Sequence, residues 1–136
     1  MSIQWTEDLS TGADDIDAQH KELILRLNTL LGACIQQKGL EEIGRYMEFL
    51  MEYVSYHFAA EEREMSTYGY PGLERHEQEH EQFKKEINAL NKEIRVNGAR
   101  MTIVQTTLWA SSEWLISHVK GTDREMARFL KKERRK

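Results

Sequence analysis

Apolar residues recur at steps of three and four along four long segments of the chain. The clearest series lies between residues 71 and 96 and reads Leu73, His76, His80, Phe83, Ile87, Leu90 and Ile94. Such steps place side chains on one face of an α-helix, and no segment shows the strict alternation that marks a half-buried strand. We therefore predict four helices, at residues 17–37, 40–65, 71–96 and 100–120.

Glycine and proline residues mark the ends of these segments. Gly39 can end the first helix, Pro71 suits the first turn of the third, and Asn97-Gly98 follows the third. Four amphipathic helices joined by short loops bury their apolar faces by packing on one another. The expected fold is all-α, an up-down-up-down four-helix bundle within a single domain of residues 1–136. Its expected parts are an irregular N-terminal arm (1–16), the bundle (17–120) and a short C-terminal helical extension (121–136).

The apolar faces also contain all five histidines of the chain and one glutamate, namely His20, His57, Glu61, His76, His80 and His118. Four of these residues form two i,i+4 pairs, which place both members of a pair on the same helix face. Burying several imidazoles and a carboxylate without partners costs about a few kcal/mol each, and together more than the roughly 5–15 kcal/mol of net stability of a domain. A bound cation offsets that cost because it gives each group a partner, so the pattern indicates a metal site.

The end of the fourth helix decides whether Asp123 joins these residues. His118 and Asp123 lie about 140° apart on a straight α-helix. Gly121 can end a helix, and Thr122 with Glu125 forms a T-x-x-E capping box that can start another. We predict a break or a π-type bulge at Gly121, which turns Asp123 inward. On an unbroken helix, Asp123 is instead a helix-capping acid.

Five short motifs in this order resemble the hemerythrin family. They are the arm with Trp5, "IDAQH" ending at His20, "HFAAE" from His57 to Glu61, "HEQEH" from His76 to His80, and "HVKGTD" from His118 to Asp123. The resemblance covers nearly the whole chain. It implies a non-haem di-iron centre (Fe2+/Fe3+) in the bundle core, with His76, His80 and His118 on one iron and His20 and His57 on the other. It also implies that Glu61, Asp123 and a solvent-derived oxo or hydroxo group bridge the two ions.

This ligand set implies a binding function. Five histidines, two bridging carboxylates and one bridging oxygen leave one octahedral position empty, on the iron with two histidines. By the resemblance, dioxygen binds there end-on as a hydroperoxide and is released by the reverse steps. We therefore expect a reversible dioxygen carrier, store or delivery protein and not an enzyme.

Reversible oxygen binding requires that water and reductants stay out of the site. Seven residues lie one position or one helical turn from the predicted ligands, and they can line a dry oxygen pocket. The same positions also suit ordinary core packing. They are Leu23, Ile24, Phe58, Trp114, Leu115, Val119 and Met126.

Two other metal chemistries compete with this interpretation. His76, Glu77 and His80 spell the H-E-x-x-H pattern of zinc metalloproteases. The extended protease pattern fails because Glu86 stands where its third histidine belongs, and we expect Glu77 to face outward, about 100° from His76. A ferritin-like di-iron oxidase requires two E-x-x-H pairs, and only Glu77 to His80 has that spacing. The zinc protease therefore stays a remote alternative.

Other roles remain open at the same site, namely sensing or scavenging of O2, nitric oxide or peroxide, and iron handling. A sensor normally needs an output domain, and the sequence ends about a dozen residues after Asp123. We therefore expect a stand-alone bacterial-type hemerythrin that binds dioxygen, with an O2-consuming enzyme as a candidate partner.

The composition of the chain predicts the cellular compartment of the protein and limits the kinds of partner it can bind. The chain has one cysteine, Cys34, and shows neither a signal peptide nor a membrane span, so we expect a cytoplasmic protein without membrane insertion. A net charge of -4 argues against nucleic acid as a partner. We interpret the basic terminal "KKERRK" as a solvated helix end. Polar outer helix faces predict a monomer or a weak oligomer.

Overall fold

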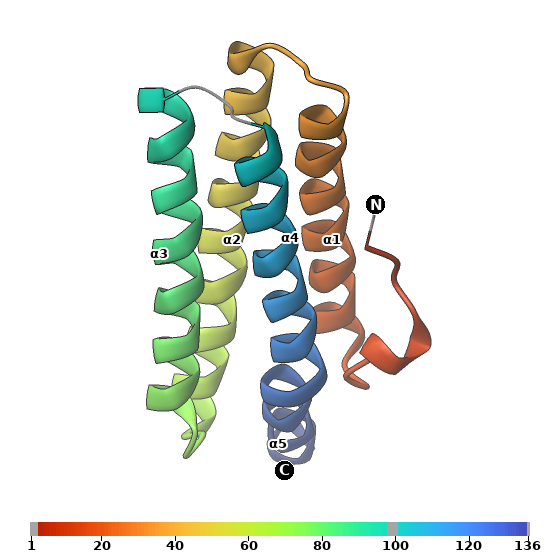
Figure 1. The fold of residues 1–136 in the computed structure, drawn as a ribbon. Helices are drawn as coiled ribbons and strands as arrows, with labels where there is room; N and C mark the ends of the chain where they lie inside the picture. The colour runs from red at the N-terminus through yellow and green to blue at the C-terminus, as the bar shows by residue number, and fades with distance from the viewer. Residues whose placement is uncertain (1–2, 98–100, 136) are drawn as a thin grey trace.

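The computed structural model describes residues 3–97 and 101–135, and within them the chain is helical without a strand (Figure 1). The elements are a short 3-10 turn η1 (Glu7–Leu9), α1 (Asp14–Ile35), α2 (Leu40–Tyr68), α3 (Leu73–Asn97), α4 (Met101–His118), a π-helical segment η2 (Val119–Asp123) and α5 (Arg124–Arg134). Helix α1 packs on α2 and α4, and α3 packs on the same two helices. This arrangement confirms the predicted all-α four-helix bundle.

The helix boundaries differ from the predicted ones by a few residues for local reasons. Helix α1 ends at Ile35 because Gln37 turns the chain with a left-handed φ of 54°, so Gly39 is the N-cap of α2 and not the end of α1. Helix α2 continues to Tyr68 and ends where Gly69 adopts a left-handed φ of 69°. Pro71 lies in the turn before α3 and outside its first helical turn.

The predicted start of the fourth helix near Arg100 lies outside the described residues. The structure describes α4 from Met101. None of the helices in the described ranges is long and apolar enough to cross a membrane.

The chain continues from α4 into α5 through the π-helical segment η2, without a break. The π-type alternative at Gly121 is therefore the one the structure adopts. The predicted capping box is wrong, because Asp123 occupies the N-cap of α5 in a helical conformation and no side chain caps it. The Thr122 hydroxyl instead donates to the Glu79 carboxylate on α3, at 2.9 and 3.2 Å from its two oxygens.

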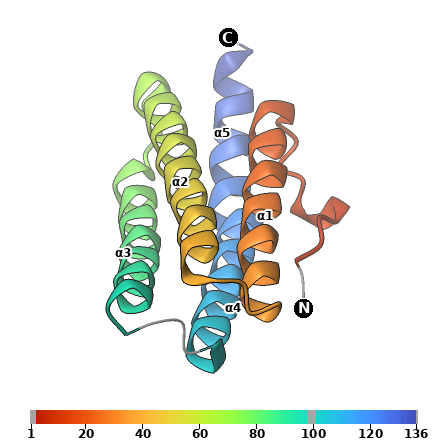
Figure 2. The same cartoon turned by 90° about the horizontal axis from the view of Figure 1, so that it is seen from above.

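The N-terminal arm runs along the outside of α1 (Figure 2). The backbone N–H of Ile3 donates to Asn28 Oδ1 at 2.8 Å, and Asn28 Nδ2 donates back to the Ile3 carbonyl at 2.8 Å. Leu9 inserts into the core and is 2% exposed. The arm is thus attached by paired hydrogen bonds to α1 and by the buried apolar side chains of Ile3 and Leu9.

Two apolar clusters fill the interior, and a polar layer separates them. Along α1, His20 lies between Ile16 of the smaller cluster and Leu23 of the larger one. Along α2, Glu61 lies between Met65 of the smaller cluster and Phe58 of the larger. The polar layer is therefore enclosed by apolar side chains on both sides.

Candidate metal centre

Seven side chains from all four bundle helices and η2 form the polar layer. They are His20 of α1, His57 and Glu61 of α2, His76 and His80 of α3, His118 of α4 and Asp123 of η2, and each is at most 3% exposed. They form two groups, and in each group one nitrogen or oxygen atom from every member lies within 4.8 Å of those of the other members. One group contains His76, His80 and His118, the other contains His20 and His57, and both contain Glu61 and Asp123.

The two oxygens of Glu61 face different groups. Oε1 lies 3.1 Å from His80 Nε2 and 3.5 Å from His76 Nε2. Oε2 lies 3.2 Å from His57 Nε2 and 3.5 Å from His20 Nε2. This carboxylate therefore has one oxygen directed to each group.

The two carboxylate oxygens of Asp123 also face different groups. Oδ1 lies 2.9 Å from His76 Nε2 and 3.0 Å from His118 Nε2, whereas Oδ2 lies 3.0 Å from His20 Nε2. The π-helical segment brings Asp123 inward, since a regular α-helix would turn it about 140° away from His118. Both carboxylates thus span the two groups.

Nine buried atoms of these residues form no hydrogen bond within the described structure. They include both oxygens of Glu61, Oδ1 of Asp123 and Nε2 of His20, His76, His80 and His118, with Nδ1 of His20 and His76 as the others. The close N to O distances lack hydrogen-bond geometry, so the atoms do not satisfy one another. Leaving a buried polar group unpaired costs about 1–3 kcal/mol. A cation in each group would supply a partner to seven of these atoms, which are all except the two Nδ1 nitrogens.

The carboxylates make this layer attractive to positive charge. Burial lowers the pKa of His20, but contact with Asp123 and Glu61 raises it overall to about 10. The same two carboxylates raise the pKa of His76 to about 9 against the effect of burial. Burial raises the pKa of Glu61 and of Asp123, yet the surrounding histidines hold both well below their ordinary values. Imidazole nitrogen with carboxylate oxygen is a donor set that suits iron.

Three polar residues beside the layer contact the outer nitrogens of histidines, and the sequence interpretation missed them. Gln19 Oε1 lies 2.7 Å from His57 Nδ1, Glu62 Oε2 lies 3.0 Å from His80 Nδ1, and Glu79 Oε1 lies 3.1 Å from His118 Nδ1. Each acceptor fixes the proton on Nδ1 and leaves the Nε2 lone pair directed into the layer, as metal-binding histidines require. Each of these three acceptors is adjacent in sequence to a predicted ligand, and a search of the positions beside the ligands could have found them.

Six of the seven predicted pocket residues lie on one side of the polar layer. Leu23, Ile24, Phe58, Leu115 and Val119 are buried in the larger cluster, and Trp114 packs against it. The Phe58 ring stacks on the His80 ring with centroids 3.7 Å apart, and Trp114 stacks on His118 at 5.0 Å. Met126 lies in the smaller cluster, on the other side of the layer from these six.

Glu77, the middle residue of the H-E-x-x-H pattern, belongs to neither group. It lies on the outer side of α3 and lines a surface hollow together with Glu74 and Glu81. Its carboxylate therefore lacks the position that a zinc protease requires of its general base.

Comparisons with known proteins show which family the chain belongs to. The family model described as "Hemerythrin HHE cation binding domain" matches residues 11–130. Bacteriohemerythrin from Stenotrophomonas maltophilia is 31% identical over 131 residues, which cover 95% of this chain and 82% of that protein. Bacteriohemerythrin from Pseudomonas paraeruginosa is 34% identical over 89% of this chain and 76% of its own length. A crystal structure of wild-type hemerythrin superimposes with a TM-score of 0.85 and 28% identity, and the match covers 94% of this chain and 97% of that one. The chain therefore belongs to the hemerythrin family.

Proposed function

We propose that the seven buried residues hold two iron ions. His76, His80 and His118 bind one ion, His20 and His57 bind the other, and Glu61 and Asp123 bridge them with a solvent-derived oxygen. The observation that carries this assignment is the division of each carboxylate between the two groups, with Oε1 and Oδ1 on one side and Oε2 and Oδ2 on the other. Hemerythrin-family membership supports iron as the metal.

The unequal histidine numbers support reversible dioxygen binding as the function. Three histidines would hold one ion and two would hold the other, so the ion with two histidines would have room for an exogenous ligand. A bound ferrous pair supplies the electrons that dioxygen binding requires. We assign the chain the role of a dioxygen carrier, store or delivery protein and not that of an enzyme.

The side chains around the layer keep the site dry and rigid. Leu23, Phe58 and Leu115 are each 1% exposed, so they exclude water from the larger cluster side. The stacked rings of Phe58 and Trp114 restrict rotation of His80 and His118. By excluding water and protons, these side chains would protect a bound ferrous pair from irreversible oxidation.

Metal analysis combined with oxygen cycling tests this function. We expect about two irons per chain, a colourless protein when reduced without air, colour on exposure to O2, and loss of that colour under vacuum. Glu77→Gln serves as the control, since Glu77 belongs to neither metal group and its loss leaves both properties nearly unchanged. One zinc per chain refutes the iron assignment. Colour that never bleaches, or net consumption of O2, nitric oxide or peroxide, favours scavenging over carriage.

A further inference from the structure

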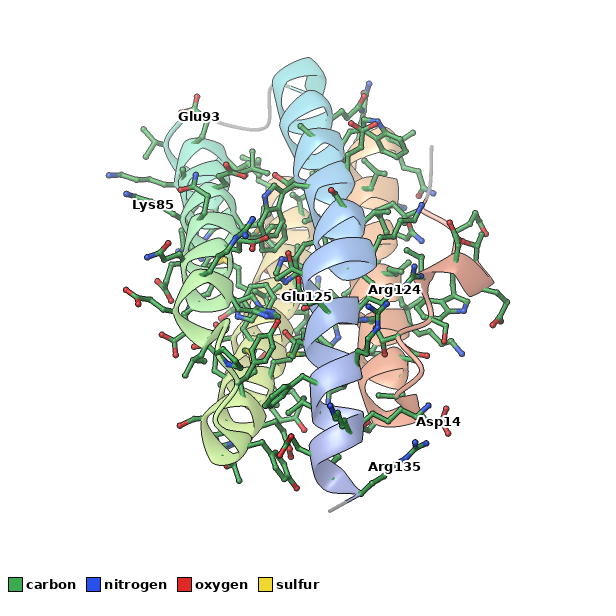
Figure 3. The ribbon with its side chains drawn as sticks, turned by 90° about the horizontal axis from the view of Figure 1, so that it is seen from below. Asp14, Lys85, Glu93, Arg124, Glu125 and Arg135 are labelled. Carbon is green, nitrogen blue, oxygen red and sulfur yellow. The ribbon has the colours of Figure 1, made fainter. Side chains whose placement is uncertain are left out.

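One face of α5 carries a stripe of cationic side chains that the metal centre does not use. The stripe and the arm residues Ser10 to Gly12 line an open hollow of about 770 Å³. Figure 3 shows Arg124 and Arg135 on the side of α5 that faces the N-terminal arm. The opposite face of α5 is buried in the smaller apolar cluster. The members of the basic stripe are Arg124, Arg128, Lys131, Lys132 and Arg135.

Most of the basic stripe lacks acidic partners. Arg128, Lys131, Lys132 and Arg135 form no ion pair with any residue in the described ranges, and Arg124 donates to the Asp8 carbonyl. The neighbouring cation Arg134, which points elsewhere, is paired with Asp15 at 3.4 Å and Glu64 at 3.3 Å. Several cations thus converge on one hollow in a chain whose net charge is -4. Like charges held together repel one another, and an anion in the hollow relieves that repulsion.

The N-terminal arm forms one wall of the hollow and does not neutralise the positive charges of the basic stripe. Asp17 lies behind the arm, where its carboxylate accepts from Ser10 Oγ at 2.7 Å and from the backbone N–H and hydroxyl of Thr11 at 2.8 Å each. Those bonds occupy the Asp17 oxygens and hold the arm in place. Gly12 has a left-handed φ of 85°, and a Cβ at this position would lie 3.6 Å from Lys131 Nζ. The arm therefore passes close to the stripe and forms the second wall.

The residues of the hollow restrict its occupant to a small polyanion. Among the residues that the structure describes, no aromatic or large apolar side chain lines it, although such residues anchor most protein interfaces. Met126, Ala127 and Leu130 of α5 are buried and Phe129 packs against the same cluster, so these apolar side chains face the protein interior and not a bilayer. Guanidinium and ammonium groups together are the usual donors to phosphate oxygens. The stripe extends about 16 Å from Arg124 to Arg135, at about 1.5 Å per residue, which is long enough for more than one phosphate group.

We propose that the hollow between α5 and the N-terminal arm binds a small anion that carries two or more phosphate groups. The site uses no residue of the metal centre, so it can be tested whether or not iron is bound.

Calorimetric titration of the full-length protein with inorganic phosphate, pyrophosphate and tripolyphosphate tests this site. We expect saturable one-to-one binding that strengthens with the number of phosphate groups and weakens as salt is added. The double variant Lys131→Gln/Lys132→Gln should bind tripolyphosphate about tenfold or more weakly. The matched control Lys85→Gln/Lys92→Gln removes the same charge from the exposed face of α3 and should bind like the parent.

Three results overturn the proposal. The first is no saturable binding of any of the three phosphates at low salt, and the second is an equal loss of affinity in the control variant, which means only general attraction. The third is binding confined to vesicles of anionic lipid or to long nucleic acids, with none to tripolyphosphate. If the α5 variant has a lower melting temperature, the order of the three phosphates and their salt dependence on the parent protein still decide the outcome.

Discussion

Replacing Glu79 by alanine tests whether groups outside the seven proposed ligands hold the centre together. The Glu79 carboxylate lies 3.1 Å from His118 Nδ1 and accepts from the Thr122 hydroxyl at 2.9 Å. Burial raises the pKa of Glu79, but contact with His118 and Thr122 lowers it below its ordinary value, so the carboxylate is ionised at neutral pH. Without this acceptor, the buried Nδ1–H of His118 loses its partner and the ring loses its fixed orientation. We expect metal affinity to fall about 10–100-fold, or about 1.4–2.7 kcal/mol.

Competition for ferrous iron against a coloured chelator, performed without oxygen, measures this loss. Glu77→Ala is the matched control, because it removes a glutamate from the same helix two positions away and outside both metal groups. Glu79→Gln keeps an amide oxygen as an acceptor, so its affinity should lie between those of the parent and Glu79→Ala. Equal iron retention by the alanine variants at positions 79 and 77 would refute the argument that the Glu79 contact orients His118.

Three more perturbations test other parts of the structure. Glu61→Ala or Asp123→Ala should lose most of the bound iron and lower the melting temperature, since each carboxylate serves both groups; unchanged iron content contradicts bridging. The metal-free protein should lose stability as pH rises from about 6.5 to about 10. Folding raises the pKa of His20 to about 10 and that of His76 to about 9, so the stability that their protonated rings contribute is fully present only below the unfolded-state pKa of about 6.5. A melting temperature, measured by circular dichroism, that stays flat or rises over this range contradicts the prediction. Gln37→Gly should stabilise the protein by about 0.5–1 kcal/mol in urea unfolding, because Gln37 has a φ of 54° that glycine adopts without strain; a destabilised variant would mean that the side chain itself contributes.

The helices and the buried histidines could be predicted from sequence because they follow from the periodicity of apolar residues. His76 and His80 occupy positions of the apolar series on α3, and the structure buries both with at most 1% exposure. A histidine in such a series is placed by the residues around it, so its direction needs no knowledge of the other helices. The helix ends were less predictable, because the local sequences around Gln37 and Pro71 are compatible with more than one kind of turn.

The segment after His118 shows where local pattern reasoning fails. Thr122 and Glu125 have the spacing of a capping box, yet the Thr122 hydroxyl donates to Glu79 of a different helix. That tertiary bond leaves the helix uncapped and continuous, and the π-helical turn rotates Asp123 into the interior. The local sequence is compatible with either a helix break or a π-type bulge at Gly121. The bond from Thr122 to Glu79, which is remote in sequence, favours the bulge.

The acceptors beside the histidines connect the centre to the order of the helices around it. Gln19 of α1 contacts a histidine of α2, Glu62 of α2 contacts one of α3, and Glu79 of α3 contacts one of α4. Each acceptor is adjacent in sequence to a proposed ligand, and one residue corresponds to about 100° of rotation around the helix. When the ligand points to the bundle axis, this neighbour points to the next helix, where it reaches the outer nitrogen of that helix's histidine. The residues that orient the centre therefore also join each helix to its successor, which explains why they resemble surface residues in sequence and lie at interhelical contacts in the structure.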